Sequence, residues 1–189
     1  MTIVAADLGS IIFMKVGHHA GETFEAILER KRREYDAAGR IFWGYGGGTM
    51  HPLNRVQPFV RMRVQHGERV SLVMQEIISR HPPTEVFATH YSSDGTTWLP
   101  MPDGVRVRGS RYALVLDQLE EGDLDIDLSS YQVGAGPSTG RNGANYIHGH
   151  VDKGCLEHVT YQQAGPSHVI HARYAAALKE PYAVLLKSE

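Results

Sequence analysis

The apolar positions near the start of the chain follow two different periods. Ser10–Val16 is a short, nearly continuous run of β-branched and aromatic residues, which predicts a buried strand. The following segment repeats its apolar residues with a helical period between Thr23, a favourable N-cap, and Gly39, a favourable residue just after a helix. Arg40–Trp43 is again a strand pattern. The chain is therefore predicted to open with a strand–helix–strand unit.

A run of four basic residues, Arg30–Arg33, lies on this predicted helix. Glu29 and Arg33 are spaced i,i+4, as in an ion pair on a helix surface. We therefore interpret the run as a solvated helix face rather than a phosphate-binding patch.

The next two segments are predicted to be a strand and a helix. Val56–Val64 has a strand pattern, and Pro58 indicates an edge position or a bulge. A second helix is predicted before His81–Pro83. Its apolar residues fall at i, i+3, i+4, i+7 and i+8, namely Val70, Val73, Met74, Ile77 and Ile78.

From Glu85 onward the apolar residues recur with a period of two, which is typical of half-buried strands. Strands are predicted at Glu85–Tyr91, Val105–Val107, Tyr112–Leu119, Asp123–Val133, Asn145–Val151 and Tyr182–Lys187, while Val169–Leu178 fits either a strand or a helix. The pattern predicts an α+β fold with a mixed, mostly antiparallel, curved sheet or open barrel, flanked by two helices.

Composition narrows the class of protein without naming a ligand. A chain of 189 residues and 21.0 kDa fits a single domain, residues 1–189. Its net charge of −2 provides no global basic field for nucleic acid or membrane. The single cysteine, Cys155, is consistent with a cytoplasmic protein. Asp7 interrupts the apolar N-terminus and no basic residues precede it, so no signal peptide is expected, and no apolar stretch is long enough for a membrane span.

The stretch Gly39–Gln57 concentrates candidate binding residues at a strand end. Three successive glycines allow a sharp turn or the close approach of a ligand to the main chain. Trp43 and Tyr45 could form the wall of a pocket for a planar ring, and His51, Arg55 and Gln57 could orient such a ring or hold an anion. The alternative is an ordinary turn with a packed tryptophan.

A second glycine-rich segment spans Tyr131–Tyr146. Its backbone amides together with Arg141 and Asn142 could contact a phosphate, and Lys153 adds a further cation nearby. The glycine spacing matches neither a dinucleotide fingerprint nor a P-loop. A mobile surface loop is the alternative interpretation.

If residues 145–151 form a strand, His148, His150 and Asp152 lie on one face of it. Two imidazoles and a carboxylate at this spacing could bind a divalent metal. The metal-binding pattern of cupins does not fit, because no glutamate follows His150 at three or four residues. The solvated face of an amphipathic strand is therefore preferred, and a metal cofactor is not favoured.

Two tripeptides, His90-Tyr91-Ser92 and His158-Val159-Thr160, match the H-x-Ser/Thr motifs of two-histidine phosphoesterases. In that family the motifs lie on neighbouring strands, with one histidine acting as base and the other as acid. Because the chain contains eleven histidines and only these tripeptides match, coincidence is the preferred explanation.

Three classes of function remain open at this point. The first is a small soluble module that recognises a nucleotide, a modified base or a nucleic-acid end through the aromatic and glycine-rich stretch. The second is a hydrolase of phosphodiesters or nucleotides, which would use His90 and His158 or the metal triplet. The third is a structural or oligomeric protein, for example a homo-oligomer, whose glycine-rich loops are interfaces. The sequence does not determine whether the protein is an enzyme.

Overall fold

The computed structural model describes residues 2–19, 21–46, 51–81, 86–148, 151–161 and 163–188. Within them are three helices, α1 (Phe24–Ala38), α2 (Leu53–Gln65) and α3 (Gly143–Tyr146), and two single-turn 3-10 segments, Ala5–Asp7 and Leu128–Ser130. The strands are β1 (Thr2–Ile3), β2 (Ile11–His19), β3 (Ile41–Gly46), β4 (Ser71–His81), β5 (His90–Ser92), β6 (Leu99–Pro100), β7 (Tyr112–Asp127), β8 (Tyr131–Val133), β9 (Lys153–His158) and β10 (Val169–Lys187).

All ten strands belong to one mixed sheet, with the order β1-β7-β10-β4-β2-β9-β8 along its main path. β3 pairs with β7, and β5 pairs with the end of β10 and with β6. Among the described strands, the pairs β1–β7 and β2–β4 are parallel and seven pairs are antiparallel. The predicted α+β class is confirmed, and the sheet does not close into a barrel.

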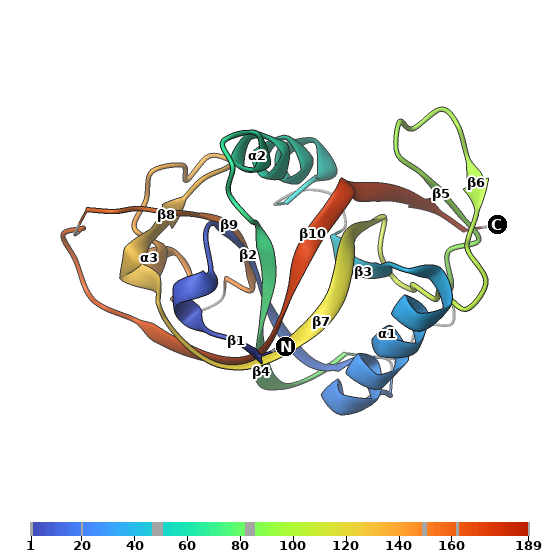
Figure 1. The fold of residues 1–189 in the computed structure, drawn as a ribbon, viewed down its shortest axis with the longest axis horizontal. Coiled ribbons are helices and arrows are strands. Elements are labelled where there is room, and N and C mark those ends of the chain that lie inside the picture. The colour runs from blue at the N-terminus through green and yellow to red at the C-terminus, as the bar shows by residue number, and fades with distance from the viewer. Residues whose placement is uncertain are drawn as a thin grey trace.

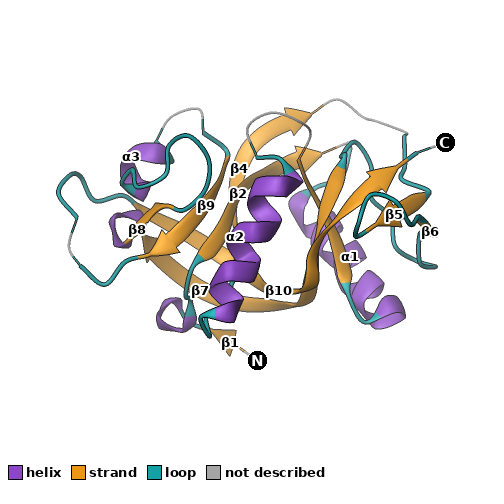
Figure 2. Ribbon diagram, turned by 90° about the horizontal axis from the view of Figure 1, so that it is seen from above, coloured by secondary structure: helices purple, strands orange, loops and turns teal. Residues whose placement is uncertain are grey.

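The long strands β7 and β10 run side by side through the middle of the molecule and bend strongly (Figure 1). β8, β9 and α3 lie at one end, whereas β5 and β6 lie at the other (Figures 1 and 2). The second half of β7 alternates buried Leu124 and Ile126 with exposed aspartates, as its period of two predicts.

Helix α1 begins and ends as the sequence predicts. The Thr23 hydroxyl accepts a hydrogen bond from the Ala26 amide at 3.2 Å, which satisfies one free donor of the first turn. At the other end Gly39 has a φ of 66°, in the left-handed region, and its amide donates to Tyr35 O at 2.7 Å. None of the described helices is long and apolar enough to cross a membrane.

The predictions for residues 56–64 and 70–78 are both wrong. Residues 56–64 lie in α2, which buries Val56, Phe59 and Val60 at helical spacing and keeps Pro58 on its exposed side. Residues 71–81 form β4, a central strand with apolar clusters on both faces of the sheet. A strand buried on both faces does not need to alternate apolar and polar residues. Its run of apolar residues therefore also fitted the spacing of a helix, and the pattern was misinterpreted.

β2 and β3 lie beside each other without backbone pairing between their described residues, and we call this place the β2–β3 seam. β3 pairs only with β7 among the described strands, and β2 pairs with β9 only as far as Met14. The two strands meet there through side chains. The Trp43 indole N–H donates to Met14 Sδ at 3.2 Å, and the Tyr45 hydroxyl donates to Phe13 O at 3.0 Å.

Candidate functional site

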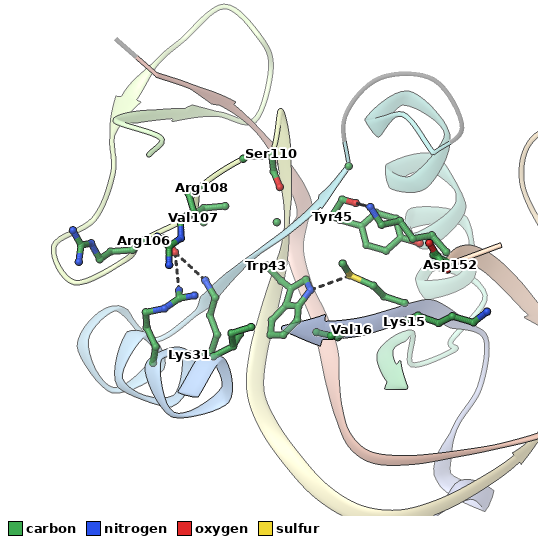
Figure 3. Close-up of a pocket in the computed structure, with 18 residues that line it drawn as sticks. Lys15, Val16, Lys31, Trp43, Tyr45, Arg106, Val107, Arg108, Ser110 and Asp152 are labelled. Atoms are coloured by element: carbon green, nitrogen blue, oxygen red, sulfur yellow. Dashed lines mark hydrogen bonds between the residues drawn. The ribbon is translucent and has the colours of Figure 1, made fainter. Parts of the chain in front are cut away.

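A pocket of about 280 Å³ opens at the β2–β3 seam (Figure 3). Its walls are residues 14–17 of β2, the inner face of α1, residues 43–46 of β3, the segment 106–110 and residues 152–153. The volume is just below the usual range for small-molecule sites, which begins at about 300 Å³, so the pocket fits only a small ligand.

Trp43 lies at the base of this pocket, between Lys31 and Tyr45 (Figure 3). Only 4% of its surface is exposed, because its ring packs into the core and its N–H is bonded to Met14. The indole therefore forms a rigid floor rather than a freely standing stacking platform.

Tyr45 also lines the pocket and is fixed by its own contacts. Its ring is fully buried, and its hydroxyl is bonded to the main chain of β2. The ammonium of Lys153 donates to Tyr45 O and lies 5.2 Å from the centre of the Tyr45 ring. Burial lowers the pKa of Lys153. Lys153 is thus held at the pocket by a main-chain carbonyl and an aromatic face.

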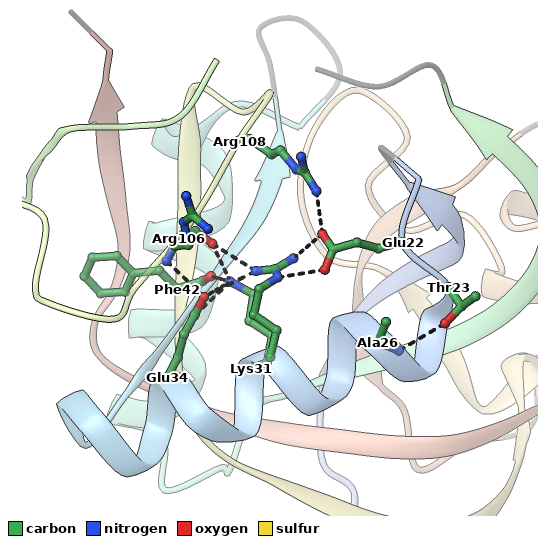
Figure 4. A network of polar contacts seen from close by, with 9 residues as sticks. Glu22, Thr23, Ala26, Lys31, Glu34, Phe42, Arg106 and Arg108 are labelled. Atoms are coloured by element: carbon green, nitrogen blue, oxygen red, sulfur yellow. Dashed lines mark hydrogen bonds and ion pairs between the residues drawn. The ribbon is translucent and has the colours of Figure 1, made fainter. Parts of the chain in front are cut away.

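Ion pairs hold the wall formed by α1 and the segment 105–110 (Figure 4). Glu22 accepts from Arg30 Nε at 2.9 Å and from Arg108 Nη2 at 2.6 Å. Arg30 also donates to Arg106 O at 3.1 Å. These contacts connect the start of α1 to a segment more than seventy residues later in the chain.

The centre of this network is buried. The Lys31 ammonium is 3.0 and 2.9 Å from the two carboxylate oxygens of Glu34, and it also donates to Phe42 O at 2.5 Å and Arg106 O at 3.1 Å. Glu34 accepts further bonds from the Arg106 amide at 3.0 Å and from Arg30 at 3.3 Å. Burial lowers the pKa of Lys31 to about 8, and the Glu34 carboxylate opposes this shift.

The pocket and its wall carry a small excess of positive charge. Lys15 and Arg106 contribute lining atoms but extend their side chains away from Trp43 (Figure 3). The other charged side chains are four cations, Arg30, Lys31, Arg108 and Lys153, and three carboxylates, Glu22, Glu34 and Asp152. Among these described side chains the cations outnumber the carboxylates by one, in a partly enclosed site where charges interact more strongly than in water.

Several residues that the sequence singled out lie near one another. Trp43, Tyr45 and Lys153 line the pocket. His51 packs against the Tyr45 ring, with ring centres 6.2 Å apart. Burial, together with the charges of Lys153 and Arg55, lowers the pKa of His51 to about 4, so this imidazole is neutral at pH 7.

The remaining predicted ligand residues lie outside the pocket. Gln57 donates to Pro181 O at 2.8 Å, which ties α2 to β10. Arg55 is exposed on α2 near Gly136. Asn142 caps α3 by accepting from the Ala144 amide at 2.8 Å, and Arg141 is exposed beside it. Residues 47–50 of the glycine-rich stretch are outside the described part of the chain.

Sequence analysis missed Arg30, Lys31, Arg108 and Ser110 as pocket residues. The interpretation of Arg30–Arg33 as a solvated face is wrong for Lys31, which is only 4% exposed. It holds for Arg33, which is 3.5 Å from Glu29 with 74% of its side chain exposed. The available signal was the helical spacing of Lys31 and Glu34: Lys31 lies four residues after Ile27 and three after Leu28, and Glu34 lies seven residues after Ile27, so both continue the apolar stripe.

The strand assumed for the metal hypothesis is absent from the described residues. α3 ends at Tyr146 and β9 begins at Lys153, so His148 and Asp152 do not lie on one strand. His150 is outside the described residues. No group of three His, Cys, Asp or Glu side chains that could hold a metal occurs in the described part of the chain.

The two-histidine hypothesis requires neighbouring strands, and this requirement is not met. His90 begins β5 and His158 ends β9. β9 pairs with β2, β2 with β4, β4 with β10 and β10 with β5, so three strands separate them. β5 and β9 lie at opposite ends of the molecule (Figures 1 and 2).

The buried thiol is also unsuited to nucleophilic chemistry. Burial raises the pKa of Cys155 to about 12, so the sulfur stays protonated at neutral pH.

No family model, curated protein or solved structure matches this chain. The site at the β2–β3 seam is therefore defined by its own geometry alone.

Proposed function

We propose that this chain is a binding module for a small planar ligand that carries a phosphate, of the nucleotide class, and that the ligand binds in the pocket at the β2–β3 seam. The observation that carries the proposal is the combination of an indole floor with an excess of positive charge among the described residues of a pocket of about 280 Å³. A flat apolar floor suits a heterocyclic ring, and a cationic wall suits an anion.

Each part of the pocket has a role in this proposal. Trp43 provides the apolar contact for the ring, and Lys153, which is held against Tyr45, attracts the phosphate. Arg30 and Arg108 supply further positive potential while they hold the wall through Glu22. These cations are fixed by ion pairs and carbonyl contacts, an arrangement that suits charge recognition, so we propose binding rather than turnover.

A free mononucleotide and the terminal nucleotide of a strand share this chemistry. The two sources differ in the number of phosphates and in what lies beyond the first sugar. A panel of nucleoside mono-, di- and triphosphates, together with a short single strand bearing a 5′-phosphate, therefore separates them.

The test uses Trp43 as its own reporter. Trp98 is the second tryptophan, and Trp98→Phe leaves Trp43 as the single tryptophan, whose emission can be excited selectively at wavelengths that tyrosine does not absorb. We expect a ligand-dependent change in Trp43 emission with at least one member of the panel. We also expect Lys153→Met, which keeps the apolar stem, to weaken binding by about tenfold or more, since hydrogen bonds to charged groups contribute about 1.5–3 kcal/mol.

Lys179→Met is the matched control, because Lys179 also donates to a single main-chain carbonyl, Gly39 O at 3.1 Å, but does not line the pocket. This variant should bind as the parent does. Equal weakening by the two lysine variants would contradict the proposal. So would an unchanged emission and no heat of binding across the whole panel.

A further inference from the structure

Ser110 presents a hydroxyl to the pocket wall opposite the indole floor. It is half-buried, lines the pocket and directs its oxygen toward β3 (Figure 3). Within the described part of the chain, no hydrogen bond to this hydroxyl occurs in the protein. A hydroxyl can both donate and accept, so it is available to a ligand of either polarity.

The strand beneath this hydroxyl has a glycine where any side chain would collide with it. A Cβ at Gly44 would lie 2.5 Å from Ser110 Oγ, 3.2 Å from Ser110 Cβ and 3.1 Å from a methyl of Val107. A residue with a side chain at position 44 would displace the hydroxyl or push the segment 107–110 outward. Because Gly44 has no side chain, the strand leaves room for the Ser110 hydroxyl and for the space beside it.

The other side-chain donors at this end of the pocket are already bonded within the protein. The Trp43 N–H is bonded to Met14, and the Lys31 ammonium to Glu34 and two carbonyls. Lys153 donates to Tyr45 O. Ser110 is thus the neutral polar group that can read the edge of a ring without breaking an internal contact.

We propose that Ser110 is a specificity-determining residue, which forms a hydrogen bond with the edge of a heterocyclic base lying over Trp43. This inference rests on the proposed function and deepens it, because it assigns recognition of the base to Ser110 and of the phosphate to the cations. The ligand class is then a nucleotide whose base carries a carbonyl, a ring nitrogen or an amino group at that edge.

The test separates the base from the phosphate by calorimetry. Nucleoside 5′-monophosphates of the four common bases are compared with ribose 5-phosphate, which lacks the base. We expect Ser110→Ala to weaken the tightest mononucleotide by about threefold to tenfold, the range of one neutral hydrogen bond, and to leave ribose 5-phosphate unchanged. Lys153→Met should weaken both ligands. Ser93→Ala, at an exposed turn serine, should weaken neither.

A second pair of variants tests the role of Gly44. Gly44→Ala should lower the melting temperature and abolish mononucleotide binding, because its Cβ meets Ser110. Gly44→Ala with Ser110→Gly removes the nearest clash, so it should regain part of the melting temperature but bind no more tightly than Ser110→Ala. Recovery of parental affinity in this double variant would overturn the assignment.

The two proposals fail in different ways. If the parent protein binds a mononucleotide and Ser110→Ala binds it equally well, or if Ser110→Ala weakens ribose 5-phosphate to the same extent, only the assignment of Ser110 is wrong. If the parent binds no member of the panel, the proposed function is wrong and the assignment falls with it.

Discussion

The buried pair Lys31–Glu34 is predicted to be the main polar support of the pocket wall. Removing one member of a buried ion pair typically costs about 3–5 kcal/mol, because the other charge is left without compensation. In Lys31→Met, Glu34 keeps its bonds to Arg30 at 3.3 Å and to the Arg106 amide at 3.0 Å, so we expect the lower end, about 3 kcal/mol. For a chain of this length that corresponds to a melting temperature about 6–12 °C lower.

A double-mutant cycle isolates the interaction. Glu34→Gln alone should also destabilise, since it leaves Lys31 charged and buried, whereas Lys31→Met with Glu34→Gln should cost about 2 kcal/mol less than the sum of the single changes. Urea unfolding followed by Trp43 emission measures all four proteins. The matched control is Arg33→Met with Glu29→Gln, an exposed pair on the same helix, whose coupling should stay below about 0.5 kcal/mol.

The pH dependence provides an independent check on the same pair. Burial lowers the pKa of Lys31 in the folded state to about 8, below its value of 10.5 in an unfolded chain. The unfolded state then holds its proton longer, so the stability contributed by this group rises as pH increases from about 8 toward 10.5. Lys31→Met should lose this rise. Additive single changes, or a loss below about 1 kcal/mol for Lys31→Met, would refute the role given to the pair.

Three further predictions concern other contacts of the described residues. Tyr45→Phe should cost about 1–2 kcal/mol in urea unfolding, because Phe13 O loses a buried donor, and an unchanged midpoint would contradict this. Gly39→Ala should cost about 1 kcal/mol through its positive φ alone, since no atom lies within 4 Å of the added Cβ, and ligand binding should not change. The pKa of His51 is lowered to about 4 in the folded state, so stability should fall as pH decreases from about 6.5 to 4, and His51→Asn should flatten that part of the profile.

Local signals predicted those features that depend on near neighbours in the chain. The cap at Thr23, the left-handed residue at Gly39 and the alternation in the second half of β7 all follow from contacts within a few residues. Such features have the same physical cause in an isolated segment and in the folded protein, which is why sequence patterns describe them well.

The wrong predictions for α2, expected to be a strand, and β4, expected to be a helix, arose because these elements depend on distant parts of the chain. Val56, Phe59 and Val60 do have helical spacing, but Pro58 between them favoured an edge strand. In β4, Leu72 and Met74 pack with α1 and α2, while Val73 packs into the cluster on the other face of the sheet. Whether a strand is covered on one face or two depends on the whole sheet, so the period of its apolar residues did not identify it.

For the same reason, only some residues of the candidate site could be predicted from the sequence. Trp43 and Tyr45 stand in a short stretch with an unusual composition, whereas Arg108 and Ser110 lie more than sixty residues later in an ordinary loop. Antiparallel pairing of β3 with the start of β7 brings that loop to the pocket. Without the pairing partner of β3, the sequence offers no reason to place Ser110 above Gly44.

Under the proposed function, the cations of the pocket wall would serve both folding and recognition. Arg30, Lys31 and Arg108 hold the segment 105–110 against α1 through Glu22 and Glu34. A further carboxylate would strengthen this wall, but it would also cancel the positive charge at the pocket. An excess of positive charge among the described residues of a partly enclosed site costs free energy. That excess is accounted for if an anion occupies the pocket during function, since the charge of the anion then completes the wall.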